Sequence, residues 1–201
     1  MSSADIARTR AFFSDRAAAW EDRFPGDGPA YAQAVGELAP PAGGTVLDAG
    51  CGTGRALPSV RDHAGGSATV IAVDLTVEML AEAIRRGRGT LAALVIADVT
   101  RLPLATATVD AVFAAGLLPH LPDPVAGLAE LARVVRPGGR LALFHPIGRA
   151  GQAERRGTQL RPDDIRAESN IRPALARTGW HCESVDDAAE RYLTLAVRKG
   201  A

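Results

Sequence analysis

Three glycines follow a carboxylate in the segment Val46-Leu47-Asp48-Ala49-Gly50-Cys51-Gly52-Thr53-Gly54. The apolar residues at its start predict a strand, and the residues after Gly54 predict a helix. Because they lack Cβ atoms, glycines let a loop turn tightly and let a ligand approach the backbone closely. A strand, a glycine-rich loop and a helix in this order indicate a nucleotide-type site.

The spacing of these glycines differs from that of a dinucleotide site. The dinucleotide pattern G-x-G-x-x-G brings a helix N-terminus to a pyrophosphate, but position 55 of this chain is Arg. Asp48 adds a carboxylate beside the loop, which would repel phosphate and would suit a ligand that carries an ammonium group. Both features disfavour a nicotinamide-dependent oxidoreductase.

A second carboxylate, Asp74, follows the next predicted strand, 20 residues after Gly54. At the end of a strand a carboxylate can accept two hydrogen bonds from a ribose diol. The alternative is that Asp74 caps the following helix, but Thr76 is better placed for that role. Ribose binding is therefore the favoured interpretation.

His145 follows the fifth predicted strand, at the edge where ligands of open α/β sheets bind. Pro146 biases this histidine toward an extended conformation, and an imidazole can accept a proton near neutral pH. We interpret His145 as a candidate for a polar contact to substrate. A histidine packed on the sheet edge is the alternative.

The elements that position these residues alternate between strands and helices. Strands are expected at residues 45–48, 68–73, 91–97, 109–114 and 140–144, with helices from about 55, at 76–86 and at 124–135. This alternation predicts a parallel sheet with helices on both faces. Two last strands, at 180–185 and 191–197, are separated by too few residues for a crossover and should pair antiparallel. The expected fold is a single α/β domain with a doubly wound, mostly parallel seven-stranded sheet.

The first forty residues are predicted to be helical and then interrupted. Apolar residues recur at near-helical spacing from Ile6 to Trp20, the Pro-Gly cluster at 25–29 interrupts the helix, and a second helix is expected at 30–38. We expect residues 1–41 to form a helical lid over a core of residues 42–201. Near the other end, a loop is expected at 146–157, followed by a helix that Pro173 splits or restarts.

Composition limits the possible functions. The chain has 201 residues with 23 basic and 23 acidic side chains, so it lacks the basic excess of a protein that binds nucleic acid through phosphates. Its two cysteines, Cys51 and Cys182, have no metal-ligand spacing, and no metal is expected. The chain shows neither a signal peptide nor an apolar stretch of about 20 residues. We expect a cytoplasmic monomer or homodimer with no membrane or nucleic-acid partner.

Four segments together resemble a known family. LDAGCGTG, VIAVDLTVEML, ADVTRLPLATATVDAVFAAGLLPHLPDP and RVVRPGGRLALF are similar, in order and spacing, to the motifs of class I S-adenosylmethionine-dependent methyltransferases. The resemblance covers about residues 44 to 145 and is strongest to the group that methylates small molecules. It implies S-adenosylmethionine as the cofactor, which carries an ammonium and a sulfonium but no phosphate.

The resemblance also implies roles for residues after the first four strands. Along the methionine part of the cofactor it places Asp48, Gly50 and Gly52, with Cys51 and Gly54 in the same loop. Around the ribose and adenine it places Asp74, Leu75, Met79, Asp98 and Val99. Beside the reacting methyl group it places Ala115 and Gly116.

One segment departs from the family pattern. Many relatives carry two consecutive histidines after the fourth strand, whereas this chain has Pro119 before His120. A role of the first histidine cannot be transferred, and His120 is a second candidate for substrate contact or a residue that orders the loop.

The implied activity is methyl transfer to an oxygen, nitrogen or carbon atom of a small molecule. The Asn/Asp-Pro-Pro-Tyr run common in nucleic-acid and protein-amide methyltransferases is absent. A non-enzymatic protein that binds S-adenosylmethionine remains the alternative.

Overall fold

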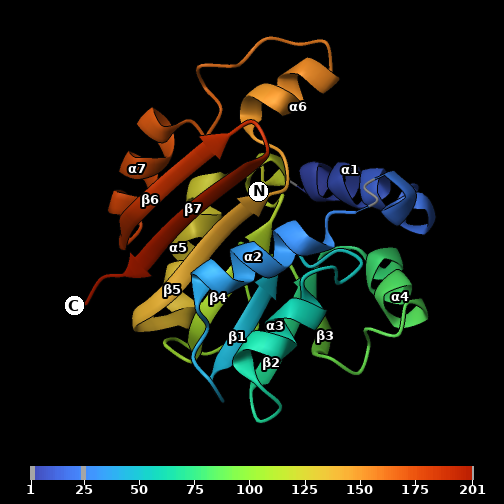
Figure 1. Ribbon diagram of the computed structural model, residues 1–201, viewed down its shortest axis with the longest axis vertical. Helices are drawn as coiled ribbons and strands as arrows, with labels where there is room; N and C mark the ends of the chain where they lie inside the picture. The colour runs from blue at the N-terminus through green and yellow to red at the C-terminus, as the bar shows by residue number, and fades with distance from the viewer. Residues whose placement is uncertain (1–2, 24–25, 201) are drawn as a thin grey trace.

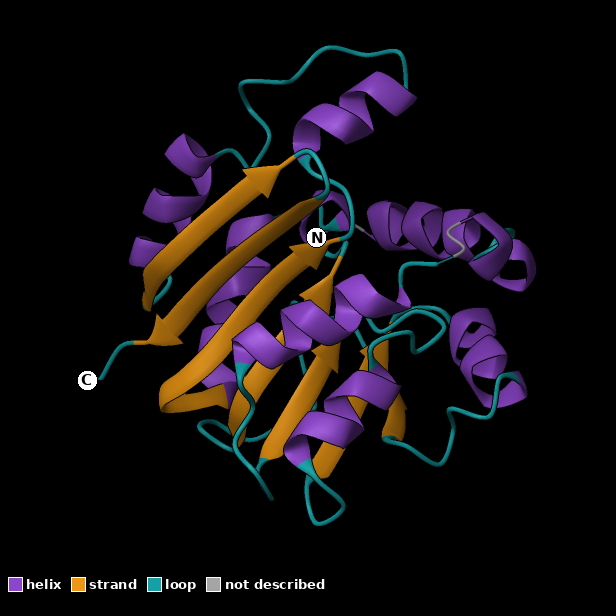
Figure 2. Ribbon diagram, in the orientation of Figure 1, coloured by secondary structure: helices purple, strands orange, loops and turns teal. Residues whose placement is uncertain are grey.

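A seven-stranded sheet of order β3-β2-β1-β4-β5-β7-β6 runs through the computed structural model, which describes residues 3–23 and 26–200 (Figure 1, Figure 2). The strands are β1 (Thr45–Ala49), β2 (Thr69–Asp74), β3 (Ala93–Ile96), β4 (Val109–Ala115), β5 (Val135–His145), β6 (Trp180–Ala188) and β7 (Arg191–Arg198). Strands β1 to β5 pair in parallel, and β7 pairs antiparallel with both β5 and β6. The predicted fold class, including the antiparallel C-terminal hairpin, is confirmed.

Helices cover both faces of this sheet. They are α1 (Ser3–Ser14), α2 (Gly28–Leu38), α3 (Leu57–Ala64), α4 (Val77–Arg85), α5 (Pro124–Val134), α6 (Arg149–Arg155) and α7 (Glu168–Arg177), with short 3-10 turns η1 (Ala17–Ala19), η2 (Glu21–Arg23) and η3 (Leu118–His120). Successive strand residues face opposite sides. Val46 accordingly packs in one apolar cluster with α2 and α3, and Leu47 packs in another with α5 and α7. No helix in the described ranges is long and apolar enough to cross a membrane.

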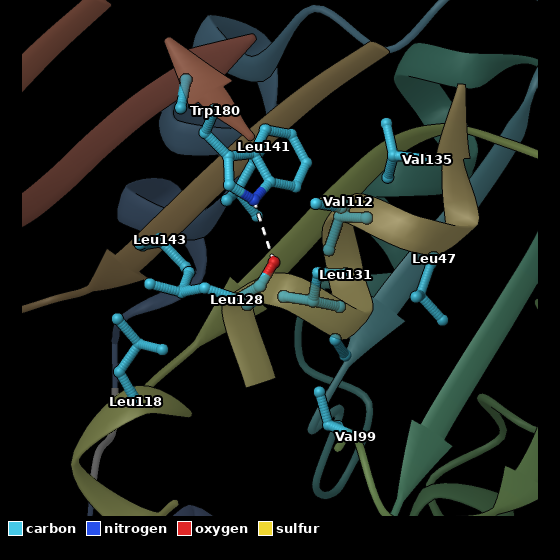
Figure 3. Packing of buried hydrophobic residues seen from close by; sticks show 14 of the residues in the cluster. Leu47, Val99, Val112, Leu118, Leu128, Leu131, Val135, Leu141, Leu143 and Trp180 are labelled. Carbon is cyan, nitrogen blue, oxygen red and sulfur yellow. Dashed lines mark hydrogen bonds between the residues drawn. The ribbon is translucent and has the colours of Figure 1, made fainter. Parts of the chain in front are cut away.

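The cluster on the α5 and α7 face is closed by a tryptophan. Trp180 at the start of β6 is 0% exposed, and its indole Nε1 donates a hydrogen bond of 3.0 Å to the carbonyl oxygen of Leu128 in α5 (Figure 3). A buried indole needs such a partner because its N–H has no water to bond. The contact holds the C-terminal hairpin against the helix layer.

The N-terminal forty residues divide into two parts. In α2, Ala34, Val35 and Leu38 are fully buried against the sheet, so α2 belongs to the core layer although the predicted lid extended to residue 41. In α1, none of residues 4–14 is buried. The lid hypothesis therefore applies only to residues before α2. Residues 1–2 of the predicted lid, and Pro25 of the predicted break, lie outside the described residues.

Two sequence predictions about the helices were wrong. The N-terminal helix ends at Ser14 instead of continuing to Trp20, and the rest of that segment folds into η1 and η2. Pro173 does not split α7, because it removes only one backbone hydrogen bond while Ile171 and Leu175 remain fully buried in the core.

The region after β5 also differs from the prediction. Residues 149–155 form α6, where a loop was expected. The β6–β7 hairpin fixes this helix, since the backbone N–H and the Nε of Arg149 donate to the Asp187 carboxylate at 2.8 and 2.7 Å. Gly148 just before it has no space for a Cβ, which would lie 1.8 Å from the Ala188 carbonyl oxygen. Figure 1 shows α6 and α1 at the end of the sheet toward which the parallel strands point.

Candidate functional site

The glycine-rich loop after β1 is held by the neighbouring strand. The N–H groups of Gly50 and Cys51 donate to the carbonyl oxygen of Val73 at 2.8 and 2.9 Å. Gly50 has a φ of 69°, and a Cβ there would lie 2.9 Å from Leu117 Cδ1. Both constraints favour glycine at this position.

Gly54 has a different surrounding from the other two glycines. It also has a positive φ of 76°, but a Cβ there would meet Leu57 Cδ1 of α3 at 2.9 Å. It does not line the cavity described below. Its need for glycine comes from the turn into α3, and the structure separates it from the other predicted cofactor residues.

Asp74 joins the glycine loop to the start of α4. Its Oδ2 accepts a hydrogen bond from the Gly52 N–H and its Oδ1 accepts one from the Thr76 N–H, both at 2.8 Å. Burial raises the pKa of Asp74, and these backbone N–H groups act in the opposite direction. Thr76 occupies the N-cap position of α4, as predicted, but its side chain makes no capping hydrogen bond. Each Asp74 oxygen keeps a further lone pair for a ligand.

Asp48 is the most unusual carboxyl group of the site. It is 1% exposed, and its Oδ2 has no hydrogen-bond partner among the described residues. Burial, and then the nearby charge of Asp74, raise its pKa to about 8. A buried carboxylate oxygen without a partner is costly, so this atom calls for a cation or a hydrogen-bond donor from a ligand.

A cavity of about 340 Å³ lies at the carboxyl ends of β1 to β5. It brings together every predicted cofactor residue except Gly54. These residues are Asp48, Gly50, Cys51, Gly52, Asp74, Leu75, Met79, Asp98, Val99, Ala115 and Gly116. We call this part of the cavity the cofactor half.

Both predicted histidines line the other part of the same cavity, which we call the acceptor half. The Nδ1 of His145 lies 2.9 Å from the carbonyl oxygen and 3.1 Å from the backbone nitrogen of Ile147. Burial lowers the pKa of His145 to about 4, against an opposing effect of the Ile147 hydrogen bond. The imidazole is therefore uncharged at neutral pH, and its Nε2 is the nitrogen outside this contact.

His120, in η3, is in contact with the N-terminal helix. Its ring lies 4.9 Å from the Phe13 ring in an edge arrangement and 6.2 Å from the Phe12 ring in a stacked one. The surrounding protein displaces water from the imidazole and lowers the pKa of His120, and Arg156 and Arg166 act in the same direction. The side chain nevertheless keeps contact with solvent. Phe13 also meets Trp20 at 5.5 Å, so aromatic rings cover the acceptor half.

Polar contacts connect the N-terminal segment to the glycine loop. The Glu21 carboxylate accepts hydrogen bonds from Thr53 Oγ1 at 2.5 Å and from Arg88 Nη1 at 2.6 Å. Arg55 Nη1 donates to Asp27 at 3.3 Å. These polar contacts, together with the ring contacts of Phe13, hold the residues before α2 over the cavity.

Sequence reasoning missed several lining residues, of which Gln152 and Arg156 are the most polar on the acceptor side. Both belong to the segment predicted as a loop. Ala150, Gln152 and Ala153 favour helix, and this preference was the available signal, although Gly151 weakens it. The aromatic residues of the N-terminal segment, by contrast, lie in the predicted lid.

The fold and site define a class I, Rossmann-like methyltransferase domain. Residues 47–143 match the family model described as a methyltransferase domain. The demethylmenaquinone methyltransferase of Beutenbergia cavernae is 44% identical over 101 residues, which are 50% of this chain and 40% of that protein. The malonyl-[acyl-carrier protein] O-methyltransferase of Hahella chejuensis is 36% identical over 96 residues, which are 48% of this chain and 34% of that protein.

A solved structure agrees along most of the chain. The S-adenosylmethionine-dependent methyltransferase of Aquifex aeolicus superposes with a TM-score of 0.69 and 26% identity, over 84% of this chain and 89% of that one. The chain spans less than half the length of the curated relatives it matches. The matched residues 47–143, the fold and the cavity agree with the resemblance to class I S-adenosylmethionine-dependent methyltransferases that the sequence motifs indicate.

Proposed function

We propose that the protein transfers a methyl group from S-adenosylmethionine to an oxygen, nitrogen or carbon atom of a small molecule. The observation that carries this proposal is one cavity with two unlike halves, one with carboxylates and glycines and the other with imidazoles and rings. A methyltransferase needs such a pair of adjacent sites, because the reaction requires aligned partners and exclusion of water.

The cofactor half fits the proposed cofactor. The unpartnered Oδ2 of Asp48 is suited to the ammonium group, and the open lone pairs of Asp74 are suited to the ribose hydroxyls. Leu75 and Met79 offer an apolar surface to the adenine, and Asp98 offers a carboxylate to its amino group. When bound, the cofactor supplies a methyl group on a positively charged sulfur, which is a good leaving group.

The acceptor half has groups that can orient a nucleophile. In the proposed reaction the acceptor atom forms a bond to the methyl carbon while the carbon–sulfur bond breaks and its electron pair stays on sulfur. An acceptor that arrives protonated must lose its proton. The uncharged His145 can take it, but its pKa of about 4 makes it a weaker base in the free protein than the sequence predicts. Gly116 lies near His145 at the junction of the halves, where a Cβ would be in ordinary contact with His145 Cδ2 at 3.9 Å, and its φ of 66° favours glycine.

Enclosure supports a small acceptor. The volume of about 340 Å³ includes both halves of the cavity, so the acceptor half is only part of it, and α1 covers that part with Phe12 and Phe13. A macromolecular chain would require α1 to move away. The name of the Beutenbergia relative indicates a small-molecule acceptor for that protein, and the balanced charge of this chain is unlike that of a nucleic-acid binder.

A direct test combines calorimetry with a turnover assay. The purified protein should bind S-adenosylmethionine and S-adenosylhomocysteine but not NAD, and should form S-adenosylhomocysteine with members of a small-molecule panel. Turnover only with nucleic acid or protein would contradict the small-molecule acceptor. Cofactor binding with no turnover on any acceptor would favour the non-enzymatic alternative.

A further inference from the structure

We infer that the acceptor carries an anionic oxygen group, a carboxylate or a phosphate, which Arg156 binds at the mouth of the acceptor half beside His145 and His120. This inference rests on the proposed function. It concerns a part of the cavity that the proposed cofactor residues do not reach.

The charged groups of the cavity are distributed unevenly over the sheet. Asp27 and Arg55, which also line the cavity, pair with each other at 3.3 Å beside the glycine loop. Three carboxylates line the cofactor half: Asp48 near the end of β1, Asp74 at the end of β2 and Asp98 just after β3. The acceptor half lies over β4 and β5, on the other side of the point where the strand order reverses. Near the ends of these two strands the cavity is lined by His120, His145 and Arg156.

Arg156 is placed for a ligand by α6. It follows the helix directly and lies four residues after Gln152, so both side chains occupy the same face and both line the cavity. The guanidinium of Arg156 makes no hydrogen bond or ion pair with any described residue. Of the other arginines in this region, Arg149 pairs with Asp187 at 2.7 Å and Arg166 pairs with Asp164 at 2.8 Å, while Arg155 is exposed and does not line the cavity.

The hydrogen bonds of Gln152 do not involve Arg156, whose positive charge has no carboxylate partner among the described residues. The largely buried Arg166 donates from Nη1 to Gln152 Oε1 at 3.0 Å, and Asp164 neutralises its charge. Since Oε1 is occupied, the amide nitrogen of Gln152 faces the Ile147 carbonyl oxygen, to which it donates at 2.8 Å. This network fixes α6 next to His145 without using Arg156.

The electrostatic consequence is a positive field at the acceptor end. Arg156 and Arg166 both lower the pKa of His120 and of His145, and no acidic group acts in the opposite direction on either imidazole. A guanidinium is suited to bidentate contact with a carboxylate or phosphate. The aromatic rings of α1 would cover the apolar remainder of such an acceptor.

The cofactor carries a carboxylate of its own, which is the competing occupant for Arg156. That carboxylate is bonded to the same carbon as the ammonium group. The proposed partner of the ammonium, Asp48, lies in β1, which β4 separates from β5 and from α6. The test therefore uses protein saturated with S-adenosylhomocysteine, whose binding is measured first. Arg156→Gln should leave this binding unchanged, and a large loss would assign Arg156 to the cofactor and overturn the inference.

The probes are two pairs of small molecules, each an anion and a neutral counterpart: 4-hydroxybenzoate with 4-hydroxybenzamide, and phenyl phosphate with phenol. Binding of each probe is measured by NMR of the histidine ring signals. At least one anion should bind, shift the ring signals of His145 and His120, and raise the pKa of His145, while its neutral counterpart should not. Arg156→Gln should weaken that binding about tenfold or more, as expected for loss of a charge-assisted contact. The matched control is Arg155→Gln, an exposed neighbour that does not line the cavity.

A second measurement needs no ligand. In the free protein, Arg156→Gln should raise the pKa of both His120 and His145, whereas Arg155→Gln should not. Unchanged pKa values, neutral probes that bind as well as the anions, or no anion binding at 10 mM would each overturn the inference. If S-adenosylhomocysteine itself does not bind, the proposed function fails instead, so the two failures are distinguishable.

Discussion

The two halves of the cavity are built in different ways. The cofactor half comes from one continuous part of the chain, between Asp48 and Gly116, and its groups are held by backbone hydrogen bonds between neighbouring strands. The acceptor half comes from α1, η3, the end of β5 and α6, which are far apart in sequence. Side-chain contacts such as those of Glu21 and Gln152 hold it together.

This difference in construction suggests which half is common to related enzymes and which half varies among them. Groups fixed by a parallel sheet can change little without disturbing the strands, so they suit a cofactor common to many enzymes. Segments joined to the edge of the sheet by a few side chains can change while the sheet persists. The substrate of this protein should therefore be decided by the α1 and α6 residues.

The largest effect is expected from the acceptor half. His145→Ala should lower turnover about 10²-fold or more if the imidazole accepts the proton of the acceptor, because the uncharged ring is the base. Cofactor affinity should be retained. The matched comparison is His120→Ala, which removes a side chain of the same size from the lining of the same cavity. Equal, normal turnover of both variants would mean that neither histidine acts as a base.

The next effect should appear in the cofactor half. Asp74→Ala should weaken S-adenosylhomocysteine binding by about 1.5 to 3 kcal/mol, roughly 10- to 150-fold, as lost charge-assisted hydrogen bonds do. Asp74→Asn keeps the shape but has only one acceptor oxygen for the N–H groups of Gly52 and Thr76, so the thermal stability of each variant is measured beside its affinity. Asp62→Ala, at an exposed position of α3, is the control for calorimetry. Unchanged affinity in a folded Asp74→Ala variant would place the ribose elsewhere.

A smaller effect is expected in the number of protons released when the cofactor binds. Because the pKa of Asp48 is about 8 in the free protein, this carboxyl is protonated at pH 6.5, where the cofactor amino group is charged. Pairing the two should release up to about one proton, and affinity should rise as pH increases toward 8. Calorimetry in buffers of different ionisation enthalpy measures this release. Asp48→Asn should abolish it, and a wild-type release near zero would remove Asp48 as the ammonium partner.

The smallest effect is expected from the N-terminal cover. Glu21→Gln weakens the contacts to Thr53 and Arg88 while the core keeps α2 in place, so thermal stability should change little. Hydrogen exchange in residues 3–23 should increase, and S-adenosylhomocysteine should reverse part of that increase. Glu154→Gln, at an exposed position of α6, is the control. Protection of residues 3–23 as deep as that of β1 and β4 in the free protein would contradict a lid.

The sequence could predict the cofactor half of the cavity better than the acceptor half. The strand and helix alternation and the motifs around Asp48 and Asp74 are local, so the sheet and the cofactor half could be inferred. Gln152 and Arg156 were missed because α6 depends on Arg149 reaching Asp187, a contact across 38 residues. The error at Pro173 has a similar origin, since burial of α7 outweighs one lost hydrogen bond.

The contact between Trp180 and Leu128 has a spectroscopic consequence. The chain has two tryptophans, Trp180 sealed in the core and Trp20 on the cavity wall. Indole emission depends on the polarity around the ring, so the fluorescence of Trp180 reports unfolding and that of Trp20 reports events at the site. A Trp180→Phe substitution leaves Trp20 as the single tryptophan, so a change in tryptophan fluorescence then reports ligand binding in the cavity.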